Sequence, residues 1–103
     1  MLNVAPSLDH LAATYLLQVP LLAGPTAAYI TDDSIDWQNL RRDLAPFLSH
    51  GEQLLLGAAF DLSGGSHPLS LRELVLTLDG SHLRSLVEAM FLRRDEFVDL
   101  GGV

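Results

Sequence analysis

Hydrophobic residues recur three and four positions apart in five segments of the chain. This spacing places apolar side chains on one face of a helix, and it predicts helices over residues 8–18, 34–45, 50–62, 70–77 and 81–92. A Ser, Thr or Asp residue that can cap a helix stands at the start of each segment. We therefore predict an all-α fold, a compact bundle of about five helices, in a single domain over residues 1–103.

The segment 50–62 is expected at the centre of this bundle. Ser49 and Glu52 form the Ser-x-x-Glu pattern of a capping box, in which each side chain bonds a free backbone N–H at the start of a helix. Residues 54–60 are apolar nearly all the way round, which is typical of a helix buried on every face. Gly57 costs about 1 kcal/mol relative to Ala in a helix interior, and we interpret it as a point where another helix approaches closely.

Residues 20–30 follow the first helix, contain no charged residue and fit more than one structure. Pro20 ends the helix before them, and the segment is then compatible with a buried extended connector, a short helix or an arm that packs on a second copy. Exposed in a monomer, it would form a sizeable apolar patch. We therefore predict a homo-oligomer in which residues 11–30 take part. The residues expected in the contact are Leu21, Leu22, Tyr29 and Ile30.

The chain is divided by this pattern into three parts of one domain. Residues 1–30 hold the first helix and the apolar connector or arm, residues 31–94 form the helical core, and residues 95–103 are a tail. Residues 11–31 lack charge, as a membrane span would, but Pro20, Gly24 and Pro25 interrupt them. A signal peptide requires positively charged residues before its apolar stretch, and no Arg or Lys precedes this one. We therefore predict a cytoplasmic protein without a membrane segment.

The composition describes an acidic protein without cysteine or lysine. Its net charge of −7 repels a phosphate backbone and an anionic lipid surface, so nucleic acid and membranes are disfavoured as partners. The lack of cysteine excludes disulfides and thiolate metal sites. All six basic residues are arginines, which together with the many leucines indicates a GC-rich, bacterial genome.

From Glu52 to Arg94 a hydrophobic helix leads through a Gly-rich loop to a short helix at Ser70, and a turn leads to a longer helix from Ser81. This order resembles the three-helix core of helix-turn-helix and winged-helix regulators. The resemblance implies that the last helix enters the major groove of DNA. Its groove-facing positions hold one arginine and one acid, a poor set for phosphate or base contacts. The residues placed for DNA contact are His82, Arg84, Ser85, Arg93 and Arg94.

Two short motifs resemble functional motifs of other families. Residues 48–53 (LSHGEQ), followed by 74–79 (LVLTLD), resemble the signature motif and metal-binding strand of ABC-type ATPases. Residues 33–35 (DSI) resemble the Asp-Ser-Leu of carrier proteins, whose Ser takes a phosphopantetheine arm. The chain has no Gly-x-x-x-x-Gly-Lys loop and no lysine to hold a phosphate, and the Gly before the carrier Asp is missing. We therefore interpret both motifs as helix starts.

The titratable residues form no pattern typical of catalysis or metal binding. The four histidines lack the spacing that places two metal ligands on one helix face. They are His10, His50, His67 and His82. The acidic cluster over residues 32–36 lacks the Gly and the terminal Glu of a calcium loop. We therefore predict no metal, no cofactor and no enzymatic activity.

These features favour a small, non-catalytic protein that binds another protein or itself, as a homo-oligomer and most simply a dimer. The alternative is a degenerate helix-turn-helix regulator that binds DNA as a dimer. A third interpretation is an acidic inhibitor that mimics nucleic acid and occupies a basic partner, which fits the negative charge.

Overall fold

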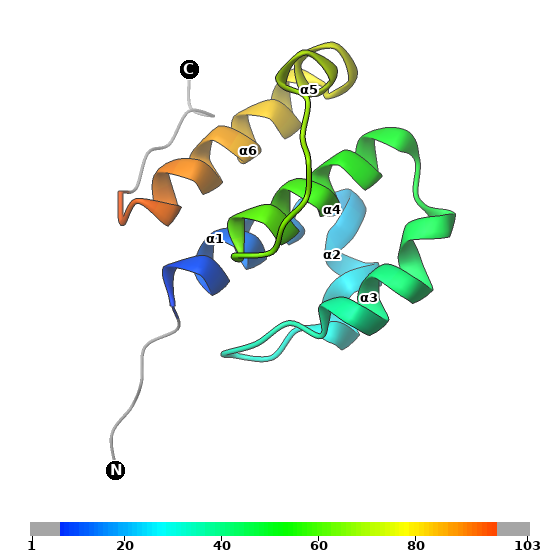
Figure 1. The fold of residues 1–103 in the computed structure, drawn as a ribbon, viewed down its shortest axis with the longest axis vertical. Helices are drawn as coiled ribbons and strands as arrows, with labels where there is room; N and C mark the ends of the chain where they lie inside the picture. Colours follow the sequence, from blue (N-terminus) through cyan, green and yellow to red (C-terminus); the bar gives the residue numbers. More distant parts are fainter. Residues whose placement is uncertain (1–6, 97–103) are drawn as a thin grey trace.

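The computed structural model describes residues 7–96, and helices make up most of this part of the chain (Figure 1). The α-helices are α1 (Leu8–Leu17), α2 (Pro20–Thr26), α3 (Trp37–Leu44), α4 (His50–Leu62), α5 (Leu71–Thr77) and α6 (Gly80–Arg93). Short 3-10 helices follow α2 over Ala27–Tyr29 and α3 over Ala45–Phe47. Within the described residues there is no strand, only an isolated bridge between Ile30 and Ile35, so the predicted all-α class is confirmed.

Residues 20–29 are helical, and α2 within them accounts for the difference between the six α-helices of the described chain and the predicted five. Pro20 both ends α1 and occupies the first turn of α2, where its missing N–H has no partner to lose. Leu22 and Thr26 are fully buried, and the Thr26 hydroxyl donates to the Leu22 carbonyl at 2.7 Å. Of the structures that fit the sequence, the short helix is therefore the correct one.

Helix α1 makes the most extensive contacts in the fold, with α6 on one side and α4 on the other. It runs antiparallel to α6, because Asp9 pairs with Arg93 while the Tyr15 hydroxyl donates to Glu88 at 2.8 Å. The centre of the bundle is thus shared by α1, α4 and α6, with α5 across one end (Figure 1). The predicted unit of α4, α5 and α6 is not confirmed in detail, because α1 contacts both α4 and α6 more extensively than those two helices contact each other.

All six α-helices contribute side chains to one hydrophobic core. Its largest fully buried side chains come from α1, α2, α3 and α4. They are Leu16, Leu17, Leu22, Thr26, Leu40 and Leu55. Helices α5 and α6 add Leu74, Leu86 and Ala89. Residues 7–96 therefore share one core. The predicted burial of residues 54–60 is confirmed for residues 54–59 of α4, whereas Phe60 is half-buried.

Side-chain caps begin five of the six helices, as the sequence pattern indicates. Each cap accepts from the N–H three positions later, and the caps are Ser7, Asp36, Ser49, Ser70 and Asp79. The predicted start of α3 near residue 34 is wrong, because residues 31–36 form a turn. There the Thr31 N–H donates to the Ser34 carbonyl at 2.9 Å, and the Asp36 N–H donates to the Tyr29 carbonyl at 2.8 Å.

Both ends of α4 carry the signals expected from the sequence. The Ser49 N–H donates to the Glu52 carboxylate at 2.8 Å, and the Glu52 N–H donates to the Ser49 hydroxyl at 3.2 Å, which completes the capping box. After the helix, Gly64 has a φ of +99°, a conformation that favours glycine. The Gly65 N–H then donates back to the Phe60 carbonyl at 3.0 Å, the long bond of a Schellman motif.

Gly57 meets a side chain from a loop and not another helix. The loop between α4 and α5 runs back across α4 (Figure 1), and it places the His67 ring on Gly57. A Cβ at Gly57 would lie 2.5 Å from Nε2 of His67. The prediction of a closely approaching helix is therefore wrong in its partner, although a close approach at Gly57 is present.

Acid should weaken the start of α4. The Ser49 N–H, and then the Ser49 hydroxyl, hold the pKa of Glu52 below its ordinary value of 4.5. Because the folded state lowers this pKa, its stabilisation is present at neutral pH and is lost as the pH falls below about 4.5. We expect Glu52→Gln to lower the melting temperature at neutral pH and to change it much less at pH 3, by circular dichroism. An equal decrease at both pH values would contradict this assignment.

Candidate interaction surface on helix α5

The short helix α5 exposes three large apolar side chains. Leu71, Val75 and Leu76 have 77%, 60% and 71% of their surface exposed, and together they are called the α5 surface. Leu74 of the same helix and Leu78 just after it are buried. Isolated exposed leucines are common on proteins, but a group of them on one short element is typical of an interaction site.

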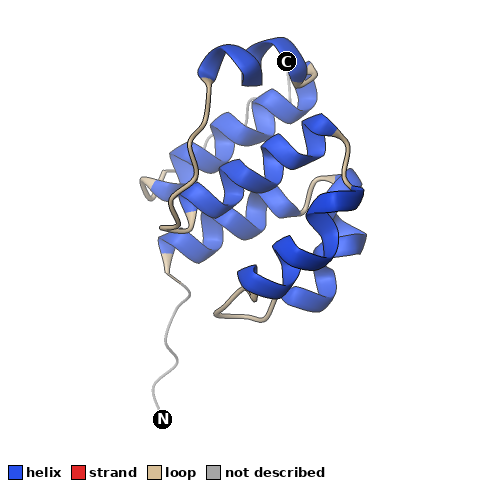
Figure 2. Cartoon of the chain, turned by 45° about the vertical axis from the view of Figure 1, so that its right-hand side comes forward, coloured by secondary structure: helices blue, strands red, loops and turns tan. Residues whose placement is uncertain are grey.

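Contacts on the inner side of α5 fix its orientation. Leu74 and Leu78 enter the core cluster, and the His50 ring lies 2.5 Å from the Glu73 carboxylate. A Cβ at Gly51, at the start of α4, would lie 3.9 Å from the Leu78 side chain, so α4 and the end of α5 are in ordinary contact there. Figure 2 shows α5 across the upper end of the bundle. The α5 surface is therefore presented outward by a helix whose opposite side is held in place.

Residues 20–30 supply less apolar surface than the sequence predicts. Leu22 was expected in an intermolecular contact, but it is fully buried and lies in the core, because α2 turns this side chain inward. Tyr29 and Ile30 are half-buried and pack against the core. Of the four predicted contact residues, only Leu21 is well exposed, at 50%.

The Tyr29 side chain is further engaged by a hydrogen bond along the surface. Its hydroxyl donates to the Asp43 carboxylate at 3.0 Å. This bond raises the pKa of Tyr29 above 10.0, because the neighbouring negative charge disfavours ionisation. The Arg42 guanidinium, together with the Tyr29 hydroxyl, lowers the pKa of Asp43. Tyr29 is therefore a neutral donor that ties the end of the Ala27–Tyr29 turn to α3.

The C-terminal arginines placed for DNA contact are paired within the chain. Arg93 forms an ion pair with Asp9 at the start of α1, and the Arg94 guanidinium lies 3.5 Å from the Glu96 carboxylate. Arg84 is exposed and has no carboxylate partner among residues 7–96. Of the three arginines placed for DNA contact, one is thus without a carboxylate partner in the part of the chain that the structure describes.

The other two DNA-contact positions, His82 and Ser85, are engaged at the start of α6. The His82 N–H donates to the Asp79 carboxylate at 2.9 Å, which lowers the pKa of Asp79, and the His82 ring lies 3.2 Å from the same oxygen. The Ser85 hydroxyl donates to the Ser81 carbonyl at 3.1 Å. Helix α1 also packs along α6.

The histidines and acidic residues singled out in the sequence lie in separate places. Within residues 7–96, no group of three or more His, Asp or Glu residues is arranged to hold a metal ion. His50 lies against Glu73, and His67 packs on Gly57. The acidic segment 32–36 forms the turn before α3. His50 and the acidic segment are thus engaged in an ion pair and a turn in separate parts of the fold.

The α5 surface is absent from the sequence-based predictions, although residues 70–78 contain a signal for it. The apolar residues of this segment are Leu71, Leu74, Val75, Leu76 and Leu78. They lie on more than one face of the predicted helix. A helix of two turns packs only one face against a neighbour, so part of this apolar set is left outside.

Among the described residues, no single helix has the length and apolar character needed to cross a membrane. Helix α1 and the segment Pro20–Tyr29 meet those criteria only as a pair, with a bend of 111° between them.

Comparison of the chain with models of known protein families, with curated proteins and with solved structures finds no match in any of the three.

Proposed function

We propose that this chain is a small, non-catalytic interaction module that binds a second copy of itself through the α5 surface. The observation that carries the proposal is the exposure of Leu71, Val75 and Leu76 on a helix fixed in the core by its other side. Apolar side chains in water gain about 25 cal/mol for each Å² that a contact buries. A partner that covers the α5 surface would therefore gain affinity at once, without rearranging the helix.

The distribution of charge favours a second copy as this partner. Residues 70–94 hold four arginines and three acidic residues, whereas the whole chain carries −7. Copies that meet at α5 would keep their acidic segments apart. Arg72 is exposed beside the α5 surface and has no carboxylate partner within the described range. It is thus available to an acidic group of the other copy, which would orient the contact.

DNA binding receives less support than self-association, because Arg93 and Arg94 are paired with carboxylates and α1 covers part of α6. Both the DNA-binding alternative and the acidic-inhibitor interpretation predict binding to a charged partner. Such binding weakens steeply with salt. An apolar contact at α5 predicts self-association that persists in salt. Salt dependence therefore separates the proposals.

Sedimentation equilibrium of the purified chain over the micromolar range, at low and at high salt, tests the proposal. We expect a reversible dimer at both salt concentrations. The double variant Leu71→Gln, Leu76→Gln should weaken dimerisation by more than about 100-fold, because both copies carry the substitutions and each of the four lost leucine side chains is worth about 1.5 kcal/mol. Circular dichroism should show unchanged helix content, since both side chains are exposed.

The matched control is Leu21→Gln, which removes an exposed leucine from α2. This variant should dimerise like the native chain. If Leu21→Gln abolishes the dimer and the α5 variant does not, the surface predicted within residues 20–30 is correct and the α5 surface is not. A native chain that stays monomeric throughout the range would overturn the proposal.

A further inference from the structure

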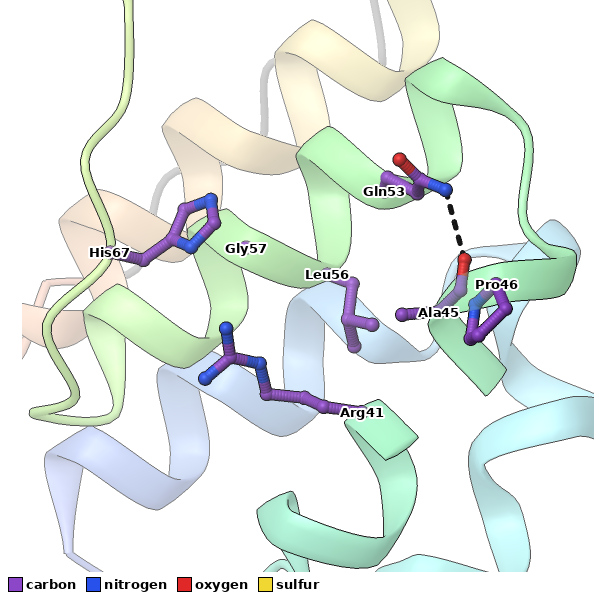
Figure 3. Close-up of a pocket in the computed structure, with 7 residues that line it drawn as sticks. All are labelled: Arg41, Ala45, Pro46, Gln53, Leu56, Gly57 and His67. Carbon is purple, nitrogen blue, oxygen red and sulfur yellow. Dashed lines mark hydrogen bonds between the residues drawn. The ribbon is translucent and has the colours of Figure 1, made fainter. Parts of the chain in front are cut away.

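A pocket of 340 Å³ lies between α4, the 3-10 turn after α3 and the loop that carries His67 (Figure 3). Helix α4 contributes Gln53, Leu56 and Gly57 to its lining, and Pro46 contributes from the turn. Arg41 and His67 lie together on one side of the pocket in Figure 3, across from Pro46. The cavity thus combines an apolar lining with two nitrogen-bearing side chains at one end.

Contacts within the chain maintain the walls of this pocket. The Gln53 amide donates to the Ala45 carbonyl at 2.9 Å and to the Leu48 carbonyl at 3.2 Å, and it fixes the turn against α4. On the opposite side, the His67 ring packs directly on Gly57, where any side chain would displace it. These contacts are local and specific, so the pocket is formed without a ligand.

Arg41 has the surroundings of a binding residue more than those of a structural ion pair. Its guanidinium lies 4.3 Å from the centre of the Phe60 ring, which Trp37 contacts edge-on at 5.2 Å. Stacking on an aromatic ring holds the guanidinium in place and leaves its in-plane N–H donors open. Its neighbour Arg42 instead pairs with Asp43 at 3.0 Å. Arg41 has no carboxylate partner within residues 7–96.

We propose that this pocket binds a carboxylate group that carries a short apolar body. The Arg41 guanidinium would hold the carboxylate, since its planar donors match both oxygens. The His67 ring carries an N–H donor in either protonation state and would provide a second bond. Leu56 and Pro46 would contact the apolar body. The pocket volume of 340 Å³ is near the lower end of the range for ligand pockets, which begins at about 300 Å³, and it limits the apolar body to a few carbon atoms.

The carboxylate has two possible sources that share this chemistry, a free short-chain acid and the carboxyl terminus of a peptide. Hexanoate is the probe for the first source, and N-acetyl-leucine is the probe for the second. Hexanamide has the same body as hexanoate without the charge. Titration of each compound into the ¹⁵N-labelled chain would report binding through the backbone amides of Gly57 and His67.

We expect saturable shifts at Gly57 and His67 with hexanoate or N-acetyl-leucine and none with hexanamide, and the tighter of the two acids identifies the source. Arg41→Gln should weaken binding of the acid at least ten-fold, because a hydrogen bond to a charged group is lost. The control Arg42→Gln should bind as the native chain does, since Arg42 lies outside the pocket and is paired with Asp43.

The variant His67→Gln keeps a donor near the pocket and leaves the Arg41 stack on Phe60 untouched, so it provides a second measure. It should weaken binding by a smaller factor than Arg41→Gln. Three results would each overturn the proposal: no saturable shift with either acid, equal binding of hexanamide, or equal losses in the Arg41 and Arg42 variants. None of these readouts depends on the oligomeric state proposed for α5.

Discussion

Leu55→Asp should unfold the domain. Leu55 lies in α4 with 1% of its surface exposed, within the core that α1 and α4 share. An unpaired carboxylate at such a place costs several kcal/mol, in addition to the packing lost with the leucine. The total is comparable to the whole stability of a domain of this size, about 5–15 kcal/mol. Circular dichroism and a ¹H–¹⁵N spectrum should show loss of helix and of dispersed signals.

The same substitution at an exposed leucine provides the control. Leu76→Asp changes a residue with 71% of its surface exposed, so the domain should remain folded. Leu55→Ala should also remain folded, but its free energy of unfolding, measured in urea, should be lower by about 2–5 kcal/mol. A Leu55→Asp chain with a native-like spectrum would mean that α4 is not part of the core.

Signals that lie within one element could be read from the sequence. The bounds of α4 follow from the capping box at Ser49 and Glu52 and from Gly64 and Gly65, which all act on their own helix end. Five of the six helix starts carry similar caps. These hydrogen bonds depend on residues three or four positions apart, so the sequence alone contains the information that specifies them.

Bounds that depend on contacts between elements could not be read in this way. Several possible caps stand in a row before α3, and the choice of Asp36 is made by its N–H bond to the Tyr29 carbonyl across the turn. Likewise, the order of elements groups α4 with α5 and α6, and it does not show that α1 contacts α4 and α6 more extensively than they contact each other. Helical spacing specifies which residues share a face, and it does not specify which helix covers that face.

The two candidate sites show the same limit. The α5 surface depends on which face of α5 packs inward, and the apolar residues of that helix lie on more than one face. The pocket joins Arg41 to His67, which are 26 positions apart in the sequence. Neither residue forms part of a recognisable motif, because the loop after α4 brings His67 back only in the folded chain.

Two adjacent leucines of α2 should respond in opposite ways to the same substitution. Leu22 is fully buried in the core, whereas its neighbour Leu21 has 50% of its surface exposed. Leu22→Asp would place a carboxylate beside apolar core residues without a partner, so we expect it to unfold the domain or to lower its stability by several kcal/mol. Leu21→Asp leaves the charge in water and should change stability by about 0.5 kcal/mol or less. Urea unfolding of both variants measures the difference.

This pair also decides between the structures that the sequence left open for residues 20–30. If the segment were an arm that packs on a second copy, both variants would fold as monomers, and both would lose the dimer. If α2 belongs to the core, only Leu22→Asp loses stability, and it does so at every protein concentration. A core helix explains why an uncharged stretch occurs here. The buried side of α2 holds Leu22 and Thr26, and the Thr26 hydroxyl bonds within the helix to the Leu22 carbonyl, as a buried polar group requires. The exposed side holds only Leu21 and small or proline residues, which water tolerates without a partner.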